Sequence, residues 1–168
     1  MKFRSATKQS NCDSAKVQDA KSCAELRATA IDLLSRREHS RQELAQKLAL
    51  KGGLAADIIQ VLEWCEQENY QSDRRFCAML VRSKIAKGYG PAVVFQSARE
   101  HNLAREMLQE SIEQLAVDWF ELALNQYRKK YSDTVVKDFK EKQKRMGFLQ
   151  RRGFNTAQIQ YAMQLQDS

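Results

Sequence analysis

The C-terminal third of this sequence carries two pairs of basic side chains whose spacing would align them on a helix. Lys144 precedes Arg151 by seven residues. Arg145 precedes Arg152 by the same interval, so each pair would share one helix face. Residues 118–153 contain ten basic and five acidic residues, in a chain whose net charge is +7. Such a cluster favours nucleic-acid phosphates or an acidic protein surface, with a merely solvated helix face as the alternative. Lys137, Lys140 and Lys142 extend the cluster.

A second set of candidate contact residues lies in the middle of the chain. Arg75 and Arg82 are also seven residues apart and would share a helix face, where partner contact and ordinary helix ion pairs both remain open. Lys87 adds a cation just before a turn in which Tyr89 stands between two glycines. Glycine permits a tight turn with positive φ. Tyr89 is therefore either a lid on the core or an exposed ring that stacks on a partner.

The residue types that usually carry catalysis do not form a recognisable pattern. The sequence has no GxxxxGK[ST] loop for nucleotide phosphates and no HExxH or ExxH pair for a metal ion. The two histidines, His39 and His101, fall between predicted helices, where we expect solvated turn residues. The acids are scattered over positions expected to be exposed, with no pair suited to acid–base work. We expect a protein that is not an enzyme and that uses no cofactor or metal.

The four cysteines indicate a reducing compartment. They show no CxxC spacing, and Cys65 and Cys77 fall among apolar residues, as buried free thiols do. The sequence has neither the apolar run of a signal peptide nor that of a membrane span. We therefore expect a soluble cytoplasmic protein. Trp64 and Trp119 are expected in the core.

The apolar pattern predicts an all-α chain, since its period is helical and the sequence contains only one proline and six glycines. Residues 1–22 lack this period, which predicts a flexible polar tail. Beyond them, three rounds of helical pattern follow, at 23–71, 72–117 and 118–168. In the first round, a capping box at Ser40 and Glu43 precedes a helix that ends at a pair of glycines.

The third round opens at Asp118 with a stripe of aromatic and aliphatic residues. Its first helix is predicted to end before Ser132 or Asp133, either of which would cap the next helix. That helix is expected to carry its apolar residues at Val135, Phe139, Met146 and Leu149.

The three rounds form an internal repeat. Residues 51–59 resemble residues 100–108, and residues 152–159 are a weaker third copy. Successive segments align at offsets of 50 and then about 52 residues. Repeats of this length stack and bury their cores against their neighbours. We therefore predict three tandem three-helix modules in an elongated, slightly curved array, expected to be a monomer.

Four stretches of the sequence resemble the RecX family and occur in the family's order. The resemblance covers residues 24–163 and departs from the family's pattern at Asn69, at Gln71-Ser72 and at 100–102, all in predicted turns. The matching stretches are Arg37-Glu-His-Ser-Arg-Gln-Glu-Leu-Ala-Gln-Lys-Leu48, Glu68-Asn-Tyr-Gln-Ser-Asp-Arg-Arg-Phe76, Lys87-Gly-Tyr-Gly-Pro91, and Lys144-Arg145 followed by Phe148-Leu-Gln-Arg-Arg-Gly-Phe154.

The resemblance implies a regulator of the RecA recombinase. Proteins similar to RecX bind the RecA filament on DNA, oppose its growth and depress its ATPase, strand-exchange and co-protease activities. We would then expect an effect on recombination, DNA repair and the SOS response, through contact with RecA and with single- or double-stranded DNA. The expected contact residues are Arg75, Arg82, Lys87, Tyr89, Lys137, Lys140, Lys144, Arg145, Arg151 and Arg152.

Two other functions remain open. The first is a basic helix-turn-helix protein that acts on DNA directly. Its recognition helix would follow Leu54, but this segment offers only Gln60 and several acids to base edges, which argues against major-groove readout. The second is a helical-repeat adaptor with an unrelated partner.

Overall fold

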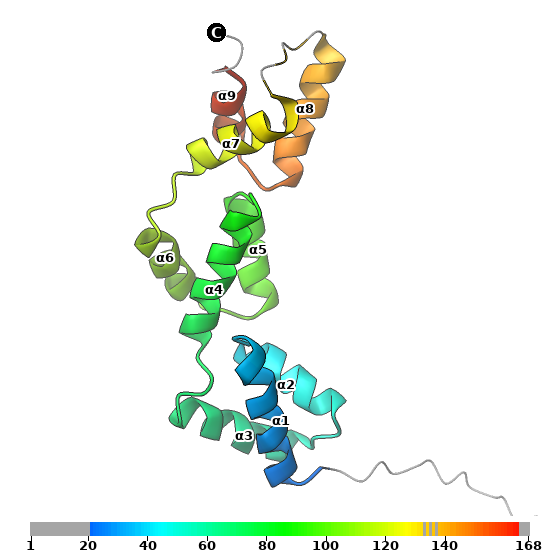
Figure 1. Ribbon diagram of the computed structural model, residues 1–168, viewed down its shortest axis with the longest axis vertical. Helices are drawn as coiled ribbons and strands as arrows, with labels where there is room; N and C mark the ends of the chain where they lie inside the picture. The colour runs from blue at the N-terminus through cyan, green and yellow to red at the C-terminus, as the bar shows by residue number, and fades with distance from the viewer. Residues whose placement is uncertain (1–20, 133, 135, 137, 165–168) are drawn as a thin grey trace, which may run out of the picture.

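Nine helices make up the part of the chain that the computed structural model describes, namely residues 21–132, 134, 136 and 138–164. They pack in consecutive groups of three, and the groups follow one another along the long axis of an elongated, slightly curved molecule (Figure 1). This arrangement confirms the predicted all-α fold of tandem three-helix modules. Module 1 contains α1 (Cys23–Arg36), α2 (Arg41–Leu50) and α3 (Ala55–Gln67); module 2 contains α4 (Asp73–Ala86), α5 (Pro91–Glu100) and α6 (Arg105–Gln114); module 3 contains α7 (Trp119–Tyr131), α8 (Phe139–Arg151) and α9 (Thr156–Gln164).

Each module has its own apolar core, formed where its three helices meet. The predicted stripes supply these cores, for example with Leu44 and Leu48 in module 1. Trp64 and Trp119 are partly buried against the cores of modules 1 and 2, as predicted. Phe139, expected on an apolar stripe, is instead 75% exposed. The apolar stripe of one helix can bury only one side of a neighbouring helix. All three helices are therefore needed to enclose each core.

Polar side chains fix where most helices begin. The hydroxyl of Ser40 accepts a hydrogen bond from the Glu43 amide at 3.1 Å, as the capping pattern predicts. The prediction that Ser132 or Asp133 caps the second helix of module 3 is wrong. Asp138 caps α8 by accepting from the Glu141 amide at 2.7 Å. Ser132 ends α7 with a φ of 50°. Asp133 and Val135 lie outside the described residues.

The turn between the second and third helices has the same backbone in all three modules. The second helix ends at a cap residue, which is Lys51, His101 or Arg152, so the repeat runs at offsets of 50 and 51 residues. The next residue has positive φ in every module, 90° at Gly52, 53° at Asn102 and 88° at Gly153. The amide two residues beyond the cap then donates to a carbonyl in the last turn of the helix, at 3.0–3.2 Å.

This turn is the surface onto which the preceding module packs. Between modules 1 and 2, the Ser40 hydroxyl lies 3.3 Å from Nδ1 of His101, whose ring packs edge-on against Phe76. The Gln71 amide donates to the His39 carbonyl at 3.1 Å. The expectation of solvated histidines is wrong for His39, which is 3% exposed and whose pKa is lowered by burial. The turn residue Gln71, a departure from the family pattern, thus contributes a hydrogen bond at this joint.

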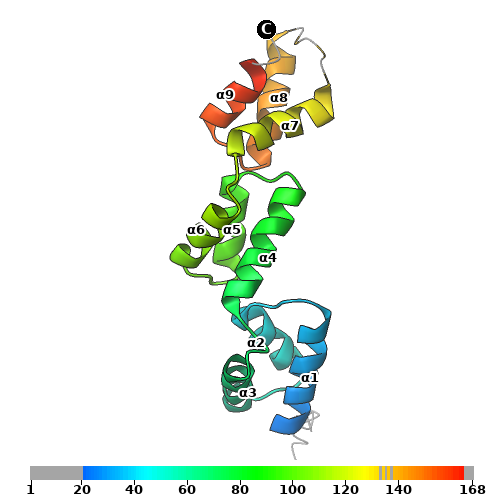
Figure 2. The same ribbon diagram turned by 60° about the vertical axis from the view of Figure 1, so that its left-hand side comes forward.

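The second joint is formed by the equivalent surfaces of modules 2 and 3, but its hydrogen bonds join backbone atoms. The Gly90 amide donates to the Arg152 carbonyl at 2.7 Å, and the Ala92 amide donates to the Gly153 carbonyl at 3.1 Å. A Cβ atom on Gly90 would lie only 2.6 Å from the Gly153 carbonyl. Glycine is therefore required here by close approach of two backbones. Both views of the molecule show module 2 held between its neighbours at its two ends (Figures 1 and 2).

Cys65 and Cys77 are buried free thiols, as predicted, and burial raises the pKa of Cys65 to about 11. No described helix is long and apolar enough to span a membrane.

Two glycine substitutions test the backbone joint. Gly90→Ala should lower the free energy of unfolding by about 1–3 kcal/mol, because the added methyl group overlaps the Gly153 carbonyl. Gly147→Ala should raise it by about 0.5–1 kcal/mol, because Gly147 lies within α8 and alanine favours helix. Chemical denaturation measures both values. Amide hydrogen exchange should also show faster exchange of the Ala92 N–H in Gly90→Ala, and an unchanged rate there would contradict the proposed role of the joint.

Candidate partner-binding surface

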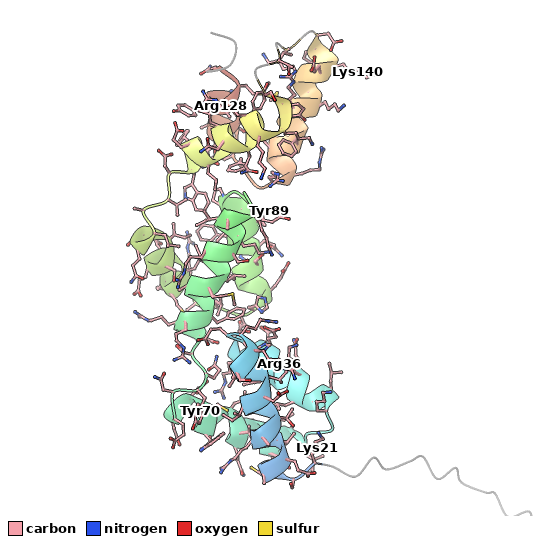
Figure 3. The ribbon with its side chains drawn as sticks, in the orientation of Figure 1. Lys21, Arg36, Tyr70, Tyr89, Arg128 and Lys140 are labelled. Carbon is pink, nitrogen blue, oxygen red and sulfur yellow. The ribbon has the colours of Figure 1, made fainter. Side chains whose placement is uncertain are left out.

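The predicted contact residues lie in three places rather than on one surface. Arg75 and Arg82 are on α4, Lys87 and Tyr89 are at the turn that follows it, and the remaining described residues are on α8 or at its end. Figure 3 shows Tyr89 at the end of module 2 that meets module 3, and Lys140 at the far end of α8. Lys137 lies outside the described residues. Each group therefore has its own set of contacts.

Tyr89 and Arg152 meet at the joint between modules 2 and 3. The guanidinium of Arg152 donates to the carbonyls of Lys87 at 2.8 Å and Gly88 at 3.1 Å, which belong to the end of α4. A cation at a helix C-terminus is stabilised by the carbonyls that the helix leaves unpaired. The same guanidinium lies 5.6 Å from the Tyr89 ring centre. Tyr89 is thus partly buried at the joint. This position lies between the buried lid on the core and the exposed stacking ring, the two alternatives that the sequence left open.

Cations and aromatic rings alternate across this joint. Lys84 lies 5.5 Å from the ring centre of Tyr89, on the module 2 side. Arg152 lies over Phe148 at 5.1 Å, and Lys130 lies over the same ring at 3.8 Å. We call these five residues the cation–aromatic row. Cations within about 6 Å of a ring centre attract its π face, so the row adds side-chain contacts to the backbone bonds of the joint.

Lys130 and Phe148 form a cation–aromatic contact that sequence reasoning missed. Phe148 belongs to one of the stretches that resemble the RecX family, and its position in that stretch does not indicate this contact. Lys130 lies next to Tyr131 at the end of α7. A basic residue beside an aromatic one is the sequence feature that could have indicated a cation–aromatic contact. Their contact joins two helices, so spacing along one helix could not reveal it.

The exposed face of α8 carries the remaining cations. Lys140, Lys144 and Arg151 are all exposed, and the seven-residue spacing places the last two on one side of the helix as predicted. Lys140 and Lys144 line a hollow of about 480 Å³ together with Tyr131, Asp138 and Glu141. Solvated ammonium and guanidinium groups in this arrangement can bind phosphates or carboxylates without a fixed pocket.

Arg145 is not a surface residue, and the prediction that it contacts a partner is contradicted by its burial. Its side chain is 1% exposed and donates to the Tyr127 hydroxyl and to the Thr134 carbonyl, both at 2.8 Å. It also pairs with Glu141. Burial opposes the charge, but the hydrogen bonds to Glu141 and Tyr127 outweigh it and hold the pKa of Arg145 above its usual range. The seven-residue spacing places Arg145 and Arg152 on one face of α8, as predicted, but this face is turned toward the interior of the protein.

Arg75 forms hydrogen bonds at the first joint, while the side chain of Arg82 is exposed. Nε of Arg75 donates to Glu38 of module 1 at 2.7 Å, and its guanidinium donates to the carbonyls of Asn69 and Tyr70 at 3.0 and 2.9 Å. These bonds hold the linker between α3 and α4, so Arg75 positions module 2 on module 1. Arg82 and Arg75 border one hollow of about 510 Å³, where the Arg82 side chain is exposed.

Histidine, cysteine and acidic side chains form no group of three or more that could hold a metal ion within the described part of the chain. Burial also raises the pKa of Cys77, which disfavours the thiolate needed for nucleophilic chemistry. The exposed cations of α4 and α8 are suited to contact with a macromolecule.

Adjacent substitutions on α8 separate burial from charge. Arg145→Gln should lower the free energy of unfolding by about 2–3 kcal/mol, because it removes the buried guanidinium that bonds the Tyr127 hydroxyl, the Thr134 carbonyl and Glu141. Lys144→Gln removes the same charge from an exposed position and should change it by less than about 0.5 kcal/mol. Urea unfolding of both variants provides the comparison. Equal stabilities would show that the buried contacts of Arg145 are not important to module 3.

Solved structures with this architecture are known. The crystal structure of RecX from Lactobacillus salivarius matches with a TM-score of 0.70, covering 86% of this chain and 96% of that one at 17% identity. A second crystal structure, of regulatory protein RecX, matches with a TM-score of 0.71 and covers 84% of this chain and 72% of that one, again at 17% identity. At this identity, the likeness shows a shared fold.

Family models and curated relatives extend the likeness to the sequence. The first, second and third three-helix domains of RecX match residues 21–65, 72–112 and 116–163, in that order. Regulatory protein RecX of Vibrio campbellii is 40% identical over 138 residues, which cover 82% of this chain and 89% of the relative. Regulatory protein RecX of Vibrio cholerae serotype O1 (strain M66-2) is 39% identical over 145 residues, covering 86% and 95%. With all three modules matched and most of both chains aligned, the protein belongs to the RecX family.

Proposed function

We propose that this protein binds RecA and RecA–DNA filaments and inhibits filament growth. It would thereby lower the ATPase, strand-exchange and co-protease activities of RecA and modulate recombination, DNA repair and the SOS response. The observation that carries the proposal is the match of all three modules to the RecX domains, in order and over most of the chain. The relatives are named regulatory proteins, which favours action by binding rather than by catalysis.

The shape of the molecule supports binding along an extended partner. Three modules in a row present a long surface, and the joints between them are held by hydrogen bonds rather than by flexible linkers alone. A preformed surface loses less conformational freedom on binding than a flexible one. We infer that the protein acts as a monomer in the cytoplasm, without a cofactor, and spans several subunits of a filament.

The exposed cations of modules 2 and 3 are the proposed contacts. Lys140, Lys144 and Arg151 on α8, with Lys87 and Arg82 on module 2, are exposed. They would bind acidic surface on RecA, DNA phosphates, or both. Arg75, Arg145 and Arg152 would act by positioning this surface, because their guanidinium groups are engaged within the protein.

RecA ATPase on single-stranded DNA tests the proposed function directly. Titration of the protein, below one molecule per RecA, should reduce the rate of ATP hydrolysis and the RecA-promoted cleavage of a repressor. Inhibition at this ratio is expected if each molecule blocks growth for many subunits. If both activities are unchanged at several-fold excess over RecA, the proposed function is wrong. Footprinting on duplex DNA would then test the alternative of a protein that acts on DNA directly.

A charge-removal variant tests the proposed contacts. Lys144→Gln together with Arg151→Gln should weaken RecA inhibition, while circular dichroism shows unchanged helix content, because glutamine is a good helix former. Arg36→Gln together with Arg99→Gln removes the same charge from exposed positions in modules 1 and 2 and serves as the matched control.

The salt dependence of DNA affinity shows whether the α8 residues contact DNA phosphates or the RecA surface. If the two α8 residues bind phosphates, each lost contact should lower the slope of log affinity for single-stranded DNA against log salt by about 0.7. If they bind acidic RecA surface, inhibition should weaken while the affinity for naked DNA is retained. Inhibition and DNA affinity equal to those of the control variant would show that the α8 face is only solvated.

A further inference from the structure

Two hollows on the surface of module 2 meet at Arg82. The first, of about 510 Å³, lies where module 2 meets module 1, and Glu38 and residues of α4 form its walls. The second, of about 390 Å³, lies where module 2 meets module 3, between the end of α4, the linker from α6 to α7, and the first two turns of α7. Because Arg82 borders both, the hollows adjoin and form one groove beside α4, which runs roughly along the long axis of the molecule (Figure 1). We call this the α4 groove.

Three guanidinium groups line the first hollow, and that of Arg82 forms no ion pair with an acidic residue in the part of the chain that the structure describes. Arg74 pairs with Glu110, and Arg75 pairs with Glu38. Nε of Arg82 donates instead to a backbone carbonyl one turn earlier on α4, at 3.1 Å. A guanidinium has five N–H donors and binds a carboxylate through two parallel hydrogen bonds. The exposed Arg82 is therefore suited to a carboxylate of a partner.

The second hollow is lined mainly by apolar side chains from three segments. They belong to the last turn of α4, to the linker between α6 and α7, and to α7 itself, namely Ile85, Ala86, Leu115, Val117 and Leu122. Leu115 is 37% exposed, and Ile85, Val117 and Leu122 are only partly buried. Apolar side chains that stay open to solvent in one hollow favour contact with apolar groups of a partner.

Two carboxylates stand at the α7 end of the groove and give it a direction. Asp118 caps α7 by accepting from the amides of Phe120 and Glu121, at 2.9 and 3.1 Å. Glu121 accepts from the Tyr161 hydroxyl at 2.8 Å. Glu121 lies three residues after the cap of α7, the position that Arg75 has in α4, so the charge changes sign between two equivalent positions of the repeat. A negatively charged group of a partner is therefore favoured at the module 1 end of the groove and disfavoured at the module 3 end.

We propose that the α4 groove binds a protein segment that places a carboxylate at Arg82 and apolar side chains against Leu115 and Val117. The helix rises about 18 Å from Arg74 to Ala86, a length that about six residues of extended chain span. Nucleic acid suits the groove less well, because its phosphates would meet apolar walls and the carboxylates of α7. The segment belongs to RecA under the function proposed above, on which this binding site depends.

Two substitutions in the full chain test the groove. Leu115→Glu puts a carboxylate against the apolar walls, and Arg82→Gln removes the guanidinium. Each should lower the affinity for RecA, measured by fluorescence anisotropy without DNA, by about tenfold, because it removes complementarity at one end of the groove. The affinity for single-stranded DNA and its salt dependence should stay unchanged, and circular dichroism should show the same helix content. Leu50→Glu and Arg99→Gln make the same changes at exposed positions that line neither hollow, and they serve as matched controls.

Three other results would overturn the proposed binding site. A lower salt slope for single-stranded DNA in Arg82→Gln, with unchanged RecA affinity, would show that the groove meets phosphates. Unchanged RecA affinity in both variants, together with full inhibition of the RecA ATPase, would show that RecA binds elsewhere and would leave the proposed function intact. If the unaltered protein neither binds nor inhibits RecA, the proposed function and the binding site both fail.

Photo-crosslinking gives a second measurement that introduces no charge. Leu115→p-benzoylphenylalanine, illuminated with RecA filaments on single-stranded DNA, should link to RecA. Mass spectrometry should place the links in a single RecA segment that combines Asp or Glu with aliphatic residues. Ile59→p-benzoylphenylalanine is the matched control, because Ile59 is 51% exposed on α3 and lines neither hollow, and it should give several-fold fewer links to that segment. Links to DNA, or links spread over many RecA segments, would contradict a groove that binds one protein segment.

Discussion

The left-handed residue that follows the second helix of each module is the constraint on which the whole array depends. At Gly52, Asn102 and Gly153 it turns the chain so that the amide two residues beyond the helix cap donates to a carbonyl in the last turn of the helix. The same turn also forms the surface that the preceding module contacts. One backbone conformation therefore determines both the interior of a module and the stacking of modules, which explains why the turns share so many hydrogen bonds while their side chains differ.

The two joints are formed at equivalent turns but by different chemistry. The first relies on side chains, with Gln71, His101 and Arg75 linking polar groups of modules 1 and 2. The second brings two backbones into direct contact, which only glycine at position 90 allows. Arg152 then adds a guanidinium to the carbonyls at the end of α4. A planar group with five donors can bond several carbonyls at once, so arginine is well suited to both joints.

Basic residues in this protein consequently have two roles. Arg75, Arg145 and Arg152 bond groups within the protein and hold modules or loops in place. Lys140, Lys144 and Arg151 remain exposed on α8, and Arg82 on α4. The first set fixes the position of the second, so a regulator that acts by surface contact would need both. A substitution in the first set would impair binding by displacing the surface, whereas one in the second would remove a contact.

The sequence by itself determined the helices, the threefold repeat and the family, because apolar period, capping residues and motif order are local properties of the chain. It identified Cys65 and Cys77 as buried thiols and placed Lys144 and Arg151 on one face for the same reason. Only the tertiary structure decided that Arg145 is buried, that His39 lies inside a joint and that Lys130 contacts Phe148. A seven-residue spacing shows which side chains lie on one helix face, but which face is buried depends on the helices that pack against it.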